Sequence, residues 1–538
     1  MRKWHGNPWA ILLTLSTGFL MTLLDLTIVN IAIPSMIDQL DASLDEVLWV
    51  VNGYVLVLAL LLITFGRLGD LKGQRNVFIA GVALFTFASL ACGVAQTPGQ
   101  LIAARLVQGL GAAALMPQTM AIIIATFPPQ RRGTALGVWG AVAGLATVLG
   151  PTLGGFLITV LDWRWIFFIN LPIGVGVLVA AYLFIPHVDL ERRHKLDWAG
   201  VGIATVALFC FTFALTEGQR YGWRPWIWAM LAAGVALVGV FIAYQARHQD
   251  DEPLVPFALF RDRNFTIMNL VGAIVSIGII GFFLPVTIYL QSVLGYSALK
   301  AGLVLAPSSV VSMVTAPIAG RMADRVGGKF ILVGGLTLFA LGTAWFTLVA
   351  EVDVSWTRFF APMVVMGAGM GCIFAPMATE AMRGVPPRLA GAASGVNNTV
   401  RQVGSVIGSA AVGALLQNRL AVALPEEAAA RAGELPPAYR DPFVHGFEQA
   451  ASGGLELGAG QTGASQTLPP GLPEQVVAQI HRLSAQVFDE GFVRAMHLTL
   501  LLPILVIAAG ALACLGMRRH QRPGAATESP AVGAVAGG

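Results

Sequence analysis

The chain has 538 residues, of which 56% are hydrophobic and only 12% are charged, and its mean hydropathy is +0.73. Soluble domains carry about 25% charged residues, so this chain has too few charges to cover a water-facing surface, and lipid must be part of its solvent. The net charge of +4 comes from basic residues scattered over short connecting segments, which argues against a nucleic-acid-binding protein.

Fourteen stretches are apolar enough to span a membrane, which takes about 20 residues per helix. A closed β-barrel would instead show alternating segments of about ten residues, and none are visible. A helix satisfies its backbone amides internally, as the bilayer interior requires. We therefore predict an all-α polytopic membrane protein with spans at residues 10–37, 47–66, 76–96, 99–126, 134–160, 165–185, 198–216, 226–246, 265–291, 300–320, 330–350, 359–382, 390–417 and 492–516.

The distribution of Lys and Arg predicts the orientation of these spans. If the N-terminus is cytoplasmic, the inner segments contain 21 Lys and Arg residues, whereas the outer segments contain only Arg164, Arg220, Arg224, Lys300 and Arg358. Positive residues concentrate on the cytoplasmic side of membrane proteins. We therefore expect a multi-pass protein of the inner or plasma membrane with both termini in the cytoplasm.

An internal repeat indicates two homologous halves. Residues 66–73 (GRLGDLKG) recur as residues 320–327 (GRMADRVG) at an offset of 254, and residues 128–138 match residues 386–396 at an offset of 258. Six helices with short loops need fewer residues than this offset, so two extra helices fit between the halves. The predicted domains are a first six-helix bundle at 1–186, two inserted helices at 187–250 and a second bundle at 251–538.

The segment 418–491, before the last predicted span, is rich in Gly, Pro, Ala and acidic residues. Such a composition is typical of a flexible loop, so we expect a long external loop here. Within it, residues 474–487 have the pattern of a short amphipathic helix. The tail after about residue 522 is expected to be disordered and cytoplasmic.

Five kinds of motif occur along the chain: residues 24–34 (LDLTIVNIAIP), the Gly-Arg-x-x-Asp segments at 66–70 and 320–324, residues 105–109 (RLVQG), residues 150–155 (GPTLGG) and residues 163–172 (WRWIFFINLP). As an ordered set they resemble the major facilitator superfamily, and within it the fourteen-helix drug:proton antiporters of the EmrB/QacA type. The resemblance implies two six-helix bundles plus two extra helices. It also implies an exporter that exchanges small molecules for protons by alternating access, driven by the proton gradient without a cofactor.

Asp25 lies near the middle of the first predicted span, where an acid costs about 2.5–3.5 kcal/mol, so it should face the bundle interior. Desolvation raises the proton affinity of a carboxyl group, which suits a proton-coupling site; a static packing acid is the alternative. Arg105 is the other buried charge in this half. The predicted helix ends place it roughly two turns nearer the outer face, which argues against a direct ion pair and leaves a structural role with Gln108 open.

The duplicated inner segments carry the charged residues Arg67, Asp70, Arg75, Arg321, Asp324 and Arg325. Such charges can simply be solvated and determine topology. Their duplication with matched glycines favours a cytoplasmic gate, in which ion pairs fasten the inner face, and the resemblance implies the same.

Two further polar or small-residue patterns lie inside spans. Ser394, Asn398, Arg401, Ser405 and Ser409 share one face of the thirteenth span, which predicts a cavity lining or helix-packing contacts, and Gln108 is a further cavity candidate. In the fifth span, small residues allow close backbone approach; the resemblance identifies them as the antiporter motif Gly150, Pro151, Gly154 and Gly155.

Three other functional classes are a membrane enzyme, a non-transporting scaffold and an exporter of a single compound. The chain contains no Gly-x-Ser-x-Gly elbow, HExxH motif or phosphate-binding loop, so a membrane enzyme is disfavoured, and no metal-ligand spacing is present. A non-transporting scaffold would gain nothing from buried charges. An exporter of one native metabolite, antibiotic, lipid or siderophore remains the alternative to a multidrug exporter. The expected partners are the lipid bilayer, protons and a small-molecule substrate; a monomer is expected, and nothing in the chain indicates a periplasmic adaptor.

Overall fold

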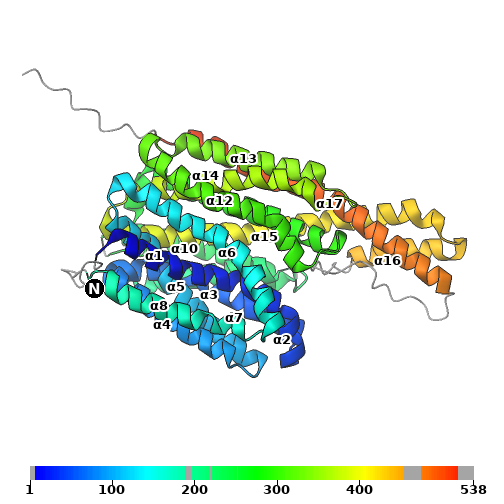
Figure 1. Cartoon of the computed structure of the whole chain (residues 1–538), viewed down its shortest axis with the longest axis horizontal. Coiled ribbons are helices and arrows are strands. Elements are labelled where there is room, and N and C mark those ends of the chain that lie inside the picture. The colour runs from blue at the N-terminus through cyan, green and yellow to red at the C-terminus, as the bar shows by residue number, and fades with distance from the viewer. Residues whose placement is uncertain (1–5, 188–195, 219, 251, 453–473, 519–538) are drawn as a thin grey trace, which may run out of the picture.

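The computed structural model describes residues 6–187, 196–218, 220–250, 252–452 and 474–518. Every regular element in these ranges is helical, and the long helices run side by side (Figure 1). Thirteen of them are long and apolar enough to cross a membrane. A further helix of 29 residues, α6 (Arg132–Val160), lies among these thirteen. The predicted all-α polytopic fold is confirmed, and the predicted fourteen spans are compatible with it.

The first bundle contains six long helices and four short helical pieces. The long helices are α1 (Pro8–Ile28), α3 (Leu44–Lys72), α4 (Gln74–Gly93), α5 (Pro98–Thr126), α6 and α8 (Asn170–Phe184). The short pieces are η2 (Val29–Ala32), α2 (Ile33–Leu40), η3 (Pro129–Arg131) and α7 (Trp165–Phe168). The predicted first span, 10–37, is therefore interrupted by η2.

The second bundle has the same number of long helices. They are α11 (Arg263–Ile288), α12 (Ala298–Val326), α13 (Lys329–Val349), α14 (Phe360–Met382), α15 (Ala390–Arg431) and α17 (Glu474–Leu515). The shorter elements are η4 (Phe257–Arg261), η5 (Tyr289–Val293), η6 (Trp356–Phe359), η7 (Pro387–Leu389), η8 (Ala432–Glu434) and α16 (Pro437–Ser452).

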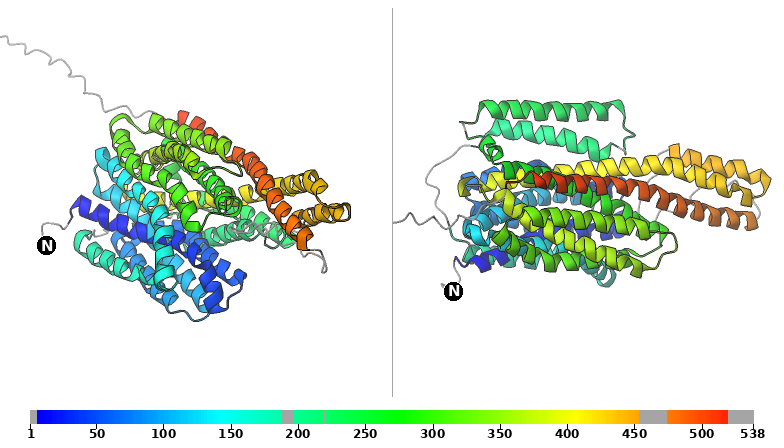
Figure 2. Two further views of the ribbon diagram at one scale, coloured as in Figure 1. Left: turned by 45° about the vertical axis from the view of Figure 1, so that its right-hand side comes forward. Right: turned by 90° about the horizontal axis from the view of Figure 1, so that it is seen from above.

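The two inserted helices, α9 (Trp198–Glu217) and α10 (Pro225–Arg247), pack against each other at one side of the molecule (Figure 2, right). Helix α9 contacts α3 of the first bundle and α15 of the second. The buried Glu217 accepts a hydrogen bond from Asn52 of α3 at 3.0 Å and pairs with Arg220 at 3.2 Å. This polar contact anchors the inserted pair to the first bundle.

The internal repeat reappears as matched helix packing. In the first bundle α4 crosses α5 so closely that a Cβ on Gly111 would lie 2.6 Å from the backbone nitrogen of Phe85. In the second, α13 crosses α14 so that a Cβ on Gly369 would lie 2.5 Å from the backbone nitrogen of Phe339. Small residues allow this approach because membrane helices associate by close packing rather than by the hydrophobic effect. The two halves therefore share one packing scheme.

Helices α3 and α12 end at corresponding glycines. Gly73 and Gly327 follow them with φ values of 91° and 85°, a region that side chains with a Cβ rarely adopt. Both helices extend beyond the predicted spans 47–66 and 300–320, so Asp70 and Asp324 lie in their last turns rather than in loops. We call this end of the molecule the repeat end.

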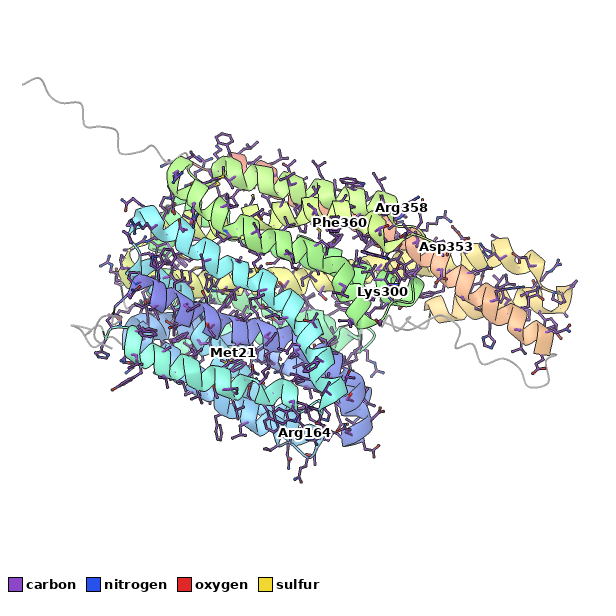
Figure 3. The ribbon with its side chains drawn as sticks, in the orientation of Figure 1. Met21, Arg164, Lys300, Asp353, Arg358 and Phe360 are labelled. Atoms are coloured by element: carbon purple, nitrogen blue, oxygen red, sulfur yellow. The ribbon has the colours of Figure 1, made fainter. Side chains whose placement is uncertain are left out.

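Both described chain ends lie at the repeat end. Near the N-terminus, the Gly6 amide donates to the carbonyl oxygen of Phe184 at the end of α8. Near the C-terminus, the carbonyl oxygen of Met517 accepts a hydrogen bond at 3.0 Å from Lys329 Nζ, which lies just after the second repeat. At the opposite end, Figure 3 shows Arg164, Lys300 and Arg358, whereas Met21 lies inside the first bundle. Three of the five basic residues predicted for the outer segments thus lie away from the repeat end.

The expectation of a flexible external loop at 418–491 is wrong for the residues that the structure describes. Helices α15 and α17 have 42 residues each, a length of about 63 Å at 1.5 Å per residue, twice a hydrocarbon core of about 30 Å. With α16 they form a helical protrusion (Figure 1, right), held by Arg431–Glu490 at 2.5 Å and Arg494–Glu426 at 3.1 Å. Residues 453–473 and the tail after 522 lie outside the described residues.

The glycine crossings generate a stability prediction. Gly111→Ala and Gly369→Ala should each lower the free energy of unfolding by about 1–3 kcal/mol, because the added methyl group meets backbone atoms that cannot move aside. The measurement is thermal unfolding of the purified protein. Gly239→Ala on α10 is the matched control, since a Cβ there meets nothing within 4 Å. Equal stability of all three variants would contradict the packing argument.

Candidate functional site

The core of the first bundle contains a closed polar cluster around Asp25. Its side chain is fully buried, as are those of Arg105 and Gln108. Arg105 Nη1 donates to Asp25 Oδ2 and, at 2.7 Å, to Gln108 Oε1. Gln108 Nε2 in turn donates to Asp25 Oδ1 at 2.9 Å. Three side chains from α1 and α5 thus form a ring of hydrogen bonds around one carboxylate.

This arrangement corrects two expectations. The argument against a direct contact between Asp25 and Arg105 is wrong, because α1 ends at Ile28 and Asp25 therefore lies in its last turn. An aspartate at this depth is within reach of Arg105, which lies near the start of α5. Gln108, predicted as a cavity-lining residue, is buried in the cluster instead, where it donates a hydrogen bond to Asp25.

Two further polar residues of the cluster were not identified from the sequence. Ser89 Oγ on α4 accepts hydrogen bonds from Gln108 at 2.7 Å and from Asn170 at 3.3 Å. Asn170, at the start of α8, also donates to Asp25 Oδ1 at 3.4 Å. Asn170 belongs to the 163–172 motif, which was the available signal, whereas a lone serine in an apolar helix gives none.

The guanidinium group of Arg105 is enclosed by α3. Its Nε donates to the carbonyl oxygen of Val50 at 3.0 Å, and its Cζ lies 4.3 Å from the centroid of the Tyr54 ring. A cation stacked on an aromatic face in a desolvated site gains about 2 kcal/mol or more. The arginine therefore keeps favourable contacts that do not involve Asp25.

The predicted antiporter motif packs α6 against the same region of α1. A Cβ on Gly150 would lie 2.0 Å from Thr27 Oγ1, and one on Gly154 would lie 2.7 Å from the Ile28 side chain. Thr27 Oγ1 also lies 3.4 Å from the carbonyl oxygen of Ala146. Gly155 has open space around it. The motif also contains Pro151, which is part of α6.

At the repeat end, each bundle binds a helix of the other. Asp70 of α3 accepts backbone hydrogen bonds from Gly391 and Ala392 of α15, at 2.8 and 2.7 Å. Asp324 of α12 accepts from Gly133 and Thr134 of α6, at 2.7 and 2.8 Å. Helix N-termini attract anions because their first amides have no partner within the helix.

We call these two contacts the reciprocal latches. They are made by the two repeat motifs found in the sequence, each binding the other motif across the interface between the halves. A Cβ on Gly391 would lie 2.5 Å from Asp70 Oδ1, and one on Gly133 would lie 2.5 Å from Asp324 Oδ1. The glycines are therefore required for the carboxylates to reach the amides.

The arginines of the predicted gate do not form the expected ion pairs with these aspartates. Arg67 lies 4.0 Å from Glu252, and Arg75 donates to the carbonyl oxygen of Tyr182 at 3.1 Å within its own half. Arg321 and Arg325 are exposed. Backbone amides replace the expected cations because the helix N-termini already supply donors directly opposite the carboxylates.

The polar stripe on α15 is mostly satisfied within its own helix. Asn398 donates to the carbonyl oxygen of Ser394 at 2.9 Å, and Ser405 donates to that of Arg401 at 3.1 Å. The Arg401 guanidinium lies 5.0 Å from the Phe374 ring centroid, and its buried Nε has no hydrogen-bond partner. Of the predicted lining residues, Arg401 is thus the one with unused hydrogen-bonding capacity.

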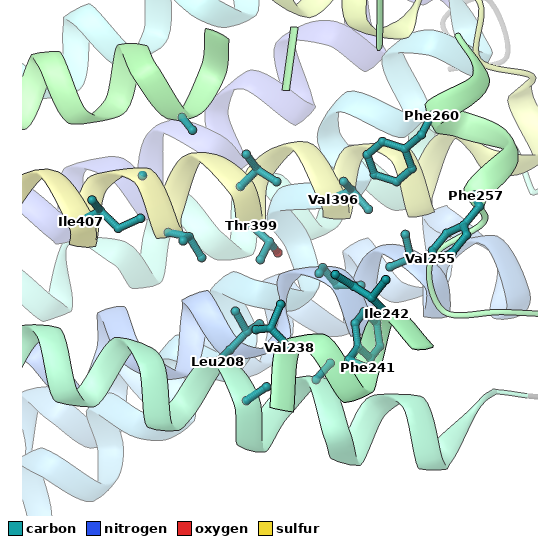
Figure 4. A pocket seen from close by; sticks show the side chains of 17 residues that line it. Leu208, Val238, Phe241, Ile242, Val255, Phe257, Phe260, Val396, Thr399 and Ile407 are labelled. Carbon is teal, nitrogen blue, oxygen red and sulfur yellow. The ribbon is translucent and has the colours of Figure 1, made fainter. Parts of the chain in front are cut away.

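A groove of about 580 Å³ lies where the inserted helices meet α15 (Figure 4). Its lining includes Leu208, Phe241, Val396 and Ile407, and Thr399 is its only side chain with a hydroxyl group. None of the charged residues of the cluster or the latches lines it. Its apolar surface suits contact with lipid tails rather than proton chemistry.

Comparison with known proteins extends these findings. The model of the Major Facilitator Superfamily matches residues 15–409. The chain is 40% identical over 460 residues to the uncharacterized MFS-type transporter Rv1250 of Mycobacterium tuberculosis, covering 83% of this chain and 79% of that protein. It is 33% identical over 461 residues to the tetracenomycin C resistance and export protein of Streptomyces glaucescens, covering 82% and 85%.

The fold is also similar to that of a solved structure. The human organic anion transporter MFSD10 superposes with a TM-score of 0.57 at 13% sequence identity, over 93% of this chain and 99% of that one. The family model spans well over half of the chain, and both bacterial relatives exceed 30% identity. The chain therefore belongs to the Major Facilitator Superfamily and is a multi-pass membrane transporter, not an enzyme.

Proposed function

We propose that the protein is a proton-coupled antiporter that exports lipophilic drugs or other small molecules from the cytoplasm by alternating access. The observation that carries the proposal is the Asp25 cluster, in which a carboxylate is fully buried within the membrane and held by Arg105 and Gln108. An acid inside a membrane is costly and belongs by default to a functional site such as a proton relay.

The cluster suits reversible proton binding. As an anion, Asp25 is stabilised by Arg105; a proton on Asp25 removes that ionic attraction. Arg105 then retains the Val50 carbonyl, the Tyr54 ring and Gln108 as partners. Both protonation states therefore have partners, which is the condition for a group that loads and releases a proton in each cycle.

Helix α6 provides a physical connection between the cluster and the interface of the halves. Gly150 and Gly154 pack on Thr27 and Ile28, two and three residues beyond Asp25. The first turn of the same helix binds Asp324 of the second bundle. A shift of α1 on protonation would thus be transmitted to a reciprocal latch as a rigid-body movement.

The orientation is part of the proposal. The arginines at the repeat end favour the cytoplasmic side for that end. In that orientation, the reciprocal latches close the cytoplasmic face. Their opening would admit substrate from the cytoplasm.

A dedicated exporter of one native metabolite is the second candidate. The export function in the name of the tetracenomycin C relative favours it, because that protein is named for a single compound. A panel of chemically distinct compounds, tested in proteoliposomes with an imposed pH gradient, separates the two candidates. Transport of several unrelated compounds supports the multidrug exporter, and transport of one supports the dedicated exporter.

Asp25→Asn should abolish proton-linked efflux while leaving folded protein in the membrane. Asparagine keeps the shape of the side chain but cannot release a proton. The measurement is substrate-induced proton movement in proteoliposomes, with the exposed Asp353→Asn as the matched control. Undiminished proton movement by the Asp25 variant would remove the coupling role.

A double-mutant cycle tests the energetics of the cluster. Arg105→Met should destabilise the protein by about 3–5 kcal/mol, because it leaves a buried carboxylate unpaired. Combining it with Asp25→Asn should recover much of this loss. Thermal unfolding of the four proteins measures the coupling. Additive losses would show that the two side chains do not interact energetically.

Asp70→Asn and Asp324→Asn should slow turnover with little change in substrate affinity. Each substitution weakens two charge-assisted hydrogen bonds from backbone amides of the other half, each worth about 1.5–3 kcal/mol, and so shifts the equilibrium between the closed and open repeat end. Turnover and equilibrium binding are measured separately. Arg247→Gln, at an exposed site outside both repeat motifs, is the control. Normal turnover in both aspartate variants would contradict a gating role.

A further inference from the structure

Arg401 lies in the middle of the second bundle without a charged partner. It is 11 residues beyond the start of α15, which places it about 16 Å from the repeat end at 1.5 Å per residue. The side chain is partly exposed, but its Nε is buried and unbonded. No acidic group lies within ion-pair distance of it in the described part of the chain.

The Arg401 side chain is separated from the contact between the halves by one aromatic residue. Its stem passes over Gly272 of α11, where a Cβ would lie 3.3 Å from Arg401 Cγ. Its charged end stacks on Phe374 of α14 at 5.0 Å. Phe374 in turn abuts the first bundle, since its Cβ lies 3.7 Å from the position of a Cβ on Gly140 of α6. Arg401 is therefore one side chain away from the interface between the bundles, where transporters built from two halves hold their substrates.

The acids on the surrounding helices are either engaged or distant. Glu380 of α14 accepts a hydrogen bond from the Gly328 amide at 2.7 Å and pairs with Arg383 at 2.8 Å. Asp25 is held by Arg105. Helices α6 and α11 contain no Asp or Glu within their bounds. The remaining acids of α12, α15 and α17 lie near the helix ends or in the protrusion: Asp324, Glu426, Glu427, Glu474, Asp489 and Glu490.

An uncompensated charge inside a membrane protein is unfavourable, and a ligand of opposite charge offsets that cost. A cationic ligand at the same place would meet repulsion. An unpaired charge thus favours ligands of opposite charge and disfavours those of like charge. The planar guanidinium can bind an acidic group through two parallel hydrogen bonds, while Phe374 offers a surface for an aromatic ring.

We propose that Arg401 is the anion-recognition residue of the substrate site, and that the protein favours amphipathic aromatic molecules that carry a carboxylate, sulfonate or comparable acidic group. The proposal rests on the proposed export function, because it assigns the substrate class of that transporter. It excludes lipophilic cations as the preferred substrates.

Two fluorescent probes with the same ring skeleton isolate the charge. 8-Anilinonaphthalene-1-sulfonate carries a sulfonate, and N-phenyl-1-naphthylamine lacks it. Equilibrium binding of each is measured to the full-length protein in lipid nanodiscs, with empty nanodiscs as the background. We expect Arg401→Gln to weaken binding of the sulfonate probe by about tenfold or more and to leave the neutral probe within about twofold of wild type.

Two control variants define the interpretation. Arg401→Lys keeps the charge but loses the planar fork, so its affinity for the sulfonate should be intermediate. Arg358→Gln removes an exposed charge at the far end of the molecule and should change neither affinity. Arg401→Gln should unfold at no lower temperature than wild type, because removal of a charge without an ion-pair partner offsets the lost stacking on Phe374.

The outcomes separate this proposal from the proposed function. Equal affinity of wild type and Arg401→Gln for the sulfonate probe, or tighter binding of ethidium than of the sulfonate by wild type, would overturn the role of Arg401. Proton-driven transport of the neutral probe without a preference for the sulfonate would overturn it as well, while leaving export intact. Selective binding of the sulfonate without any response to a pH gradient would support Arg401 and remove the proton-coupled export function.

Discussion

The contact between Asp25 and Arg105 is the interaction on which the first bundle depends. Burial of either charge alone would cost several kcal/mol. Gln108 and Asn170 donate further hydrogen bonds to Asp25, and Ser89 accepts from both of them, which supports the pair. The cluster draws one or more side chains from α1, α4, α5 and α8. It therefore both fixes the relative positions of these helices and places a titratable group at their centre.

The repeat has a second consequence at the interface of the halves. Each copy of the Gly-Arg-x-x-Asp motif ends in an aspartate that binds the first turn of a helix from the other half, and that turn belongs to the second repeated motif. The duplicated motifs thus form two equivalent contacts: the first half binds the second through Asp70, and the second half binds the first through Asp324. Each carboxylate reaches the amides only where a glycine lies opposite it, and both pairs of motifs meet this same requirement.

The halves share their scaffold but differ in their chemistry. The glycine crossings at Gly111 and Gly369 are equivalent, and so are the latches. The polar centres are not: the first bundle holds a compensated pair of charges, whereas the second holds the lone guanidinium of Arg401. Under the proposed mechanism, this division would place proton binding in the first half and substrate recognition in the second.

The sequence by itself determined the class of the protein, because hydropathy and the number of charges respond directly to a lipid solvent. It also indicated the spans, and it predicts two halves and an inserted pair, since these features depend on local composition and on repeated residues. Asp25 was recognisable for the same reason: an acid in an apolar span stands out without any knowledge of its neighbours.

Only the tertiary structure decided which residues meet. Helix α1 ends at Ile28 and is followed by η2, so Asp25 lies in the last turn of α1. The apolar pattern of the sequence does not reveal this helix end, and the contact with Arg105 was therefore not predicted. The latches use backbone amides, which carry no residue identity and leave no signal in a sequence. The helical protrusion buries apolar side chains from distant segments, such as Leu424, Phe447 and Leu483, and this burial is not evident from local composition.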